Sequence, residues 1–154
     1  MEKRDLLWAL YISEREFIQH HENQRTHASN ILGAIAAGVM IALGTEALSP
    51  VVQVALSLTL VVIGAFGWIF CAKLYALIKL HAERSYEYLK VLDEEVAAVQ
   101  IKEMKARASA KNKADFKWLS KIGLNRIWSR FHLVIFLFGL FFTVQNVLAL
   151  VGVA

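Results

Sequence analysis

Three long apolar stretches limit what this chain can fold into. They cover residues 30–48, 51–78 and 131–153 of a sequence that is 57% hydrophobic. About 20 apolar residues in a helix cross a hydrocarbon core of about 30 Å, and a helix satisfies its backbone hydrogen bonds within itself. The sequence therefore predicts an all-α membrane protein with three transmembrane helices.

The segments around these spans complete the predicted architecture. Ser49 and Pro50 are typical of a helix N-cap followed by proline at the first helical position, so the first two spans should form a tight antiparallel hairpin. We therefore divide the chain into four segments. These are a cytoplasmic amphipathic helix over 1–29, the transmembrane hairpin over 30–80, a cytoplasmic helical segment that forms a hairpin over 81–130, and a third transmembrane helix over 131–154.

The basic residues indicate how the spans are oriented. Of the 17 lysine and arginine residues, four precede the first span and twelve lie between Lys79 and Arg130. The turn after the first span and the C-terminal end carry none. Because cytoplasmic loops are enriched in lysine and arginine, we expect a multi-pass membrane protein with the N-terminus in the cytoplasm and the C-terminus outside.

The charged segments also read as helices. No glycine or proline occurs before Gly33, so one amphipathic helix should continue into the first span. The second span should continue as a helix through HAERSYEYLKVLDEEV. Within it a 3-4-3 spacing predicts a short coiled-coil-like seam of Leu89, Leu92, Val96 and Val99. The stretch RASAKNKAD is the best candidate for a turn, and FKWLSKIGLNRIWSRF after it for a second amphipathic segment.

Small and polar residues form stripes inside the spans. Helices in lipid associate where small residues let backbones approach and where polar side chains bond. Two interpretations stay open, namely packing within one three-helix unit and a hydrated axis shared by several copies. The candidates for either role are Gln53, Ser57, Gly64, Gly67, Thr143 and Asn146.

Glu46 is the ionisable residue nearest to the outer turn. In a symmetric assembly it would form a ring of carboxylates at an outer mouth, which favours cations. The simpler interpretation is a solvated turn residue, so Glu46 joins the pore-lining candidates only if the chain assembles.

Four basic residues should lie at the cytoplasmic membrane surface. Arg25, His27, His81 and His132 each lie beside a span, and we take them as juxtamembrane signal or interface candidates. Histidine titrates in the physiological range and binds metals, so a pH sensor or metal site is an alternative. No two histidines stand four residues apart in one helix, which disfavours a metal site.

The sequence shows no motif for catalysis. Cys71 is the single cysteine, which excludes a disulfide within one chain and a zinc cluster. There is no HExxH, no nucleotide-binding glycine loop and no GxSxG. We therefore expect a protein that is not an enzyme and has no cofactor. The basic residues between Lys102 and Lys121 suit anionic membrane lipids better than nucleic acid.

A helix ending NQRTHASN, a hairpin turn at Ser49-Pro50 and the charged extension HAERSYEYLKVLDEEV follow one another over roughly residues 6–100. This order resembles the small bacterial membrane effectors of the SLATT type. The resemblance implies oligomerisation and pore formation or membrane disturbance in anti-phage defence. The third span departs from that pattern. No fused sensor domain is visible, so the expected trigger is a cytoplasmic signal protein or a nucleotide ligand.

Together these features predict a homo-oligomeric bacterial inner-membrane effector that forms a pore or disturbs the membrane when signalled. One alternative is a non-enzymatic adaptor or regulatory subunit of a larger membrane complex, for which the stripes are docking surfaces. Another is a small ion channel or transporter subunit, which should give steady flux without a trigger.

Overall fold

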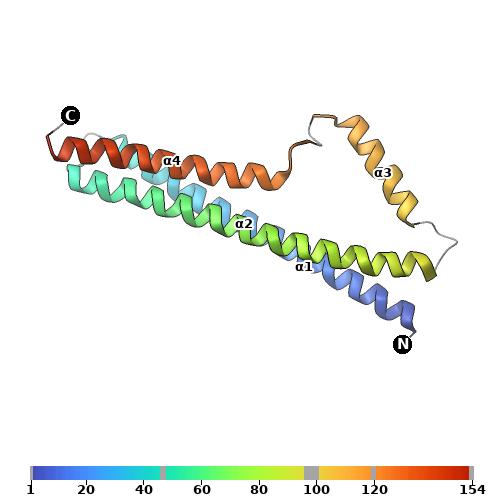
Figure 1. Ribbon diagram of the computed structural model, residues 1–154. Coiled ribbons are helices and arrows are strands. Elements are labelled where there is room, and N and C mark those ends of the chain that lie inside the picture. Colours follow the sequence, from blue (N-terminus) through green and yellow to red (C-terminus); the bar gives the residue numbers. More distant parts are fainter. Residues whose placement is uncertain (1, 46–47, 96–100, 119–120, 153–154) are drawn as a thin grey trace. The chain divides into compact units, whose positions relative to one another are not determined.

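Helices make up the fold in all the residues that the structure describes. The structure is a computed structural model that describes residues 2–45, 48–95, 101–118 and 121–152. Within these ranges there is no strand. The helices are α1 (Lys3–Leu43), α2 (Pro50–Glu95), α3 (Ile101–Asp115) and α4 (Leu124–Leu150) (Figure 1). Of these, α1, α2 and α4 are long and apolar enough to cross a membrane. The predictions of an all-α fold and of three spans of this kind are confirmed.

Helix α1 is one unbroken helix, as predicted from the lack of glycine and proline in its first half. It begins after Glu2, whose carbonyl accepts hydrogen bonds from the N–H groups of Asp5 and Leu6. It ends before Gly44, whose N–H donates to the carbonyls of Met40 and Ile41. These two bonds give partners to carbonyls of the last turn that have none within the helix.

Helix α2 starts at the predicted place. Pro50 is its first residue, and the Ser49 carbonyl accepts the N–H of Gln53 at 3.1 Å. Ser49 therefore occupies the N-cap position, and proline costs nothing at the next one because its missing N–H would have no partner there. The helix continues past the apolar stretch to Glu95, which confirms that the second span extends as a helix.

Helix α3 corrects one prediction. RASAKNKAD was expected to be a turn, but it lies inside α3. The stretch is polar, which resembles a loop, yet alanine, lysine and arginine are good helix formers and no glycine or proline interrupts them. Asp93 accepts the N–H of Ile101 at 2.7 Å and so satisfies the start of α3. Of the amphipathic segment expected after it, residues 116–118 form a turn, whereas the second half, from Leu124, is the beginning of α4.

The chain divides into two compact units, which are described separately. The charged unit comprises Met1–Asn23 and Leu74–Leu124, and the apolar unit comprises Gln24–Lys73 and Asn125–Ala154. In the charged unit α1 and α2 run antiparallel, since Lys3 pairs with Glu95 and Glu14 pairs with His81. The buried apolar side chains between them are Ile18, Leu74, Leu89 and Leu92. Val96 and Val99 of the predicted seam lie outside the described residues.

In the apolar unit, α4 packs directly on the backbone of α2. A Cβ at Gly139 would lie 2.5 Å from the Val61 nitrogen, and a Cβ at Gly64 would collide with the backbone of Phe136. Glycine at both places lets the two backbones come into contact, as expected where helices associate in lipid. The core of this unit contains Ala36 of α1, Leu60 and Ile63 of α2, and Ile135 of α4.

Candidate functional site

Ser29 is the point at which α1 bonds to both other helices of the apolar unit. Its Oγ lies 3.6 Å from Sγ of Cys71 on α2 and 3.0 Å from Nε2 of His132 on α4. The exposed fraction of each residue is 1% or less. We call Ser29, Cys71 and His132 the polar node. Hydrogen bonds between helices are the main polar contribution to helix association in lipid, so the node ties three helices together.

The surroundings of His132 indicate which atoms of the polar node carry hydrogen. Its Nδ1 is buried and has no hydrogen-bond partner among the described residues. A buried N–H without an acceptor is rarer than a buried lone pair without a donor, so the geometry favours the tautomer with hydrogen on Nε2. Nε2–H then donates to Ser29, and the Ser29 hydroxyl donates to Cys71.

Gly67 makes room for the histidine ring. A Cβ on this residue would overlap the ring of His132, so the ring lies directly on the α2 backbone. Gly67 was a candidate for either a pore lining or a helix interface, and here it is buried inside one chain. Its neighbour Gly64 is buried against α4 in the same way. Both glycines therefore serve the contact between α2 and α4.

Arg25 adds a positive charge next to the polar node. It lies one turn before Ser29 on α1, is only 3% exposed, and its Nε has no hydrogen-bond partner among the described residues. A guanidinium is almost always charged and is costly to bury unpaired. Arg25 was expected at the membrane surface as a signal or interface residue, but its burial was not foreseen.

A shallow groove opens beside the node between α1 and α4. It has a volume of about 270 Å³. The ring of Phe131 reaches within 3.1 Å of the place where a Cβ on Gly33 would lie, so Gly33 lets the two helices approach. The lining combines one polar edge with apolar walls, which suits an amphipathic molecule such as a lipid. The lining residues are Ser29, Asn30, Gly33, Ile127, Trp128 and Phe131.

The predicted polar candidates further along the spans mostly bond to their own helix. Ser57 is fully buried and its hydroxyl donates to the Val54 carbonyl at 2.9 Å. The Gln53 amide donates to the Leu48 carbonyl at 3.4 Å, at the start of α2. Ser57 therefore faces the interior of one chain in this structure.

The candidates on the third span are half-buried. Thr143 donates to the Gly139 carbonyl at 2.7 Å, whereas Asn146 makes no hydrogen bond to another described residue. Glu46 lies outside the described residues. Among the described residues, no hydrogen bond joins one of these polar candidates to another.

The juxtamembrane candidates fall into different surroundings. His81 belongs to the charged unit, where its Nδ1 lies 2.5 Å from a Glu14 carboxylate oxygen and its ring stacks on Phe17 with centroids 5.0 Å apart. His27 is exposed, and no hydrogen bond or ion pair joins it to another described residue. Within the described ranges no group of three or more His, Cys, Asp or Glu side chains could hold a metal ion.

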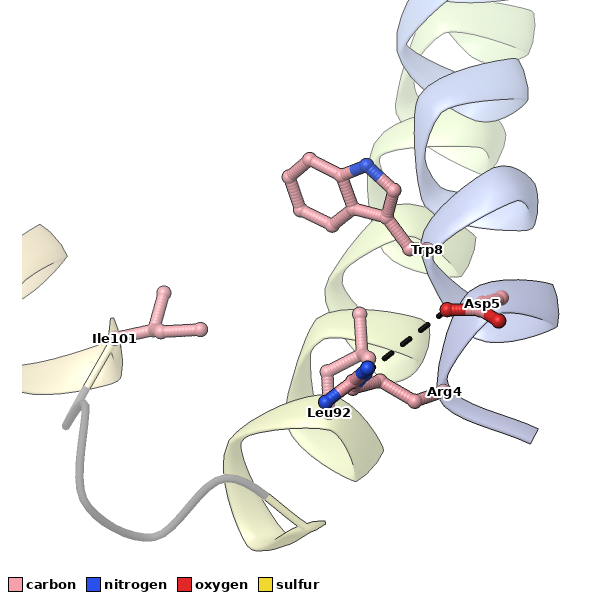
Figure 2. Close-up of a pocket in the computed structure, with 5 residues that line it drawn as sticks. All are labelled: Arg4, Asp5, Trp8, Leu92 and Ile101. Carbon is pink, nitrogen blue, oxygen red and sulfur yellow. Dashed lines mark ion pairs between the residues drawn. The ribbon is translucent and has the colours of Figure 1, made fainter. Parts of the chain in front are cut away.

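The charged unit has a small pocket where its three helices approach one another. Arg4, Asp5 and Trp8 of α1 line it together with Leu92 and Ile101, and its volume is about 260 Å³ (Figure 2). The Arg4 Nε lies 4.0 Å from an Asp5 carboxylate oxygen. Leu92 is buried, whereas half of Trp8 is exposed. The pocket thus offers an indole, an aliphatic floor and a charged rim, which suits an apolar side chain of a bound peptide.

Two important residues were missed by the sequence reasoning. Ser29 carries the polar node, and Glu14 is the partner of His81. A signal for Ser29 existed, because Arg25, Ser29 and Gly33 follow one another at intervals of four residues and so share one face of a helix. A signal for Glu14 also existed, because it is a charged residue on an otherwise apolar face of the first helix.

The comparisons with known proteins give no relative from which a role could be transferred to these residues. The chain matches no family model, no curated protein and no solved structure.

Proposed function

We propose that this chain is a homo-oligomeric effector of a bacterial inner membrane, with its charged unit in the cytoplasm. A signal received there changes the packing of the three spans, and several copies then open a pore or disturb the bilayer. In this proposal the protein is not an enzyme, and the trigger is a cytoplasmic protein or a nucleotide. The resemblance to SLATT-type effectors is part of the same proposal.

The polar node is the observation that carries the proposal. Its three side chains hold α1, α2 and α4 together and are buried away from solvent. If the helices separate, these polar atoms lose their partners, and a polar group left without a partner away from water is costly. Water or a neighbouring copy must then satisfy them, so an opened node favours a hydrated path. Because the three side chains of the polar node are buried, they can hold the helices together but cannot contact a substrate.

Helix continuity supports the transmission of a signal. Helix α1 carries Glu14, which pairs with His81 in the charged unit, and also Ser29, which belongs to the polar node. Helix α2 likewise carries both His81 and Cys71. Both helices are continuous between these residues, and small helix shifts are common in switching proteins. A ligand that moves one helix in the charged unit would therefore act on the polar node.

Glycine substitutions in the contact between α2 and α4 test the proposal. Gly64→Ala puts a methyl group into the Phe136 backbone, so it should force the helices apart and raise the leak of a trapped dye from liposomes well above the wild-type level. Gly38→Ala is the matched control, because no atom of a neighbouring helix lies within 4 Å of the new methyl group. It should leave the leak unchanged.

A Gly64→Ala protein that keeps its helix content and copy number, yet leaks no more than Gly38→Ala, would contradict the effector proposal.

The adaptor role is the second candidate, and an exposed apolar row on α1 of the charged unit favours it. That row consists of Leu6, Leu10 and Phe17. Recovery of one specific membrane protein with the wild-type chain, lost when Leu10 and Phe17 are changed to serine, together with an absence of leak, would support the adaptor.

A further inference from the structure

Helix α4 carries a row of exposed side chains at helical spacing. Its members are spaced by four, three and four residues, so they form one continuous stripe. About half of the surface of each apolar member is exposed. The members are Val134, Phe138, Phe141 and Gln145.

A groove accompanies this row. Its volume is about 340 Å³, and it is lined by Val134, Leu137, Phe138 and Phe141. The four side chains leave a hollow between neighbouring rings on the surface of a single helix. The 4-3-4 spacing and the hollow together are what a knob from a second helix needs in order to pack.

Gln145 is the polar member of the row. It is exposed, and no hydrogen bond joins its side-chain amide to another described residue. At a rise of about 1.5 Å per residue it lies about 8 Å before Leu150 along the axis, within the helix that is apolar enough to span a membrane. An amide in hydrocarbon without a partner is costly, whereas its apolar neighbours are satisfied by lipid tails.

We propose that this row is the contact between copies of the chain, with the Gln145 amides of neighbouring copies bonding to each other. An amide has both a donor and an acceptor, so it complements a second copy of itself. Copies inserted in the same direction and related pairwise by a two-fold axis along the membrane normal bring identical residues face to face. Lipid tails can fill the groove but cannot satisfy the amide. The inference rests on the proposed function, which requires several copies, and names the surface that joins them.

Energy transfer between full-length chains labelled with donor and acceptor dyes in liposomes tests the contact. Gln145→Leu should weaken association by about three- to twentyfold, the range expected for hydrogen bonds between membrane helices. Gln145→Asn keeps an amide and should retain most of the affinity. Phe138→Ala, which changes the groove instead of the amide, should also weaken association.

A relocated amide is the matched control. Val147 is exposed on α4 about 200° around the helix from Gln145, at about 100° per residue. The double variant Gln145→Leu with Val147→Gln keeps the number of amide side chains on α4, and it should associate as weakly as Gln145→Leu alone. Restored affinity in the double variant, or wild-type affinity in Gln145→Leu, would overturn the contact.

Association and leak are measured separately, so the two proposals fail in different ways. If the wild-type chain associates through Gln145 but never causes leak, the proposed contact stands and the effector function is contradicted. If Gly64→Ala raises the leak but Gln145→Leu leaves association unchanged, the effector proposal stands and the proposed contact is wrong. A wild-type chain that stays monomeric at every protein-to-lipid ratio contradicts both.

Discussion

His27 and His132 show how far one residue type can differ within one chain. Both were placed at the cytoplasmic membrane surface from sequence, but His27 is exposed and His132 is fully buried on Gly67. The difference arises because His132 fills space beside a glycine and bonds to Ser29. A histidine of this kind contributes through both packing and hydrogen bonding, so its removal should affect stability as much as function.

His132→Ala should lower the free energy of unfolding by about 2–3 kcal/mol, because it leaves a cavity and removes the hydrogen bond between His132 and Ser29. His27→Ala should change it by less than about 0.5 kcal/mol. Titration with a denaturing detergent, followed by far-ultraviolet circular dichroism, measures both. Equal effects of the two substitutions would show that the burial of His132 has no energetic consequence.

At the scale of elements, the long helices could be predicted because their signals are local. The absence of breakers in α1 and the Ser49-Pro50 start of α2 need no knowledge of the partner helices. The turn predicted at RASAKNKAD was wrong because the polarity of the stretch was taken as a loop signal, although its residues favour a helix. The polar node was out of reach, since it depends on which faces of α1, α2 and α4 meet, and a sequence stripe does not name its partner.

Helix α3 should be the least protected helix. All of its described side chains from residue 103 to the end are exposed, and a helix of 15 residues in water is marginal without packing. Hydrogen exchange measured by mass spectrometry in nanodiscs should therefore show rapid exchange of the α3 amides and slow exchange in the apolar part of α2. Protection of α3 equal to that of α2 would mean that a second copy or the lipid covers it.

At the scale of the whole molecule, the three apolar helices expose most of their surface. In the most apolar 18-residue windows of α1 and α4 only 11% of the residues are buried inside the chain, and in that of α2 28%. Lipid covers such surfaces without cost, and so does another copy. The small contact area within one chain means that a few groups decide whether the helices stay together, and the polar node is the most concentrated of these groups.

Cys71 gives the protein a built-in reporter of its conformation. It is the single thiol, and the closed helices leave 1% of the residue exposed, so a thiol reagent such as a maleimide can reach it only when they separate. If Gly64→Ala weakens the closed state by about 1.4 kcal/mol, the labelling rate should rise about tenfold, with Gly38→Ala labelled as slowly as wild type. A trigger could then be recognised by adding candidate molecules to the unmodified protein and measuring the labelling of Cys71 by mass spectrometry. The trigger is the molecule that raises this labelling, and no engineered probe is needed.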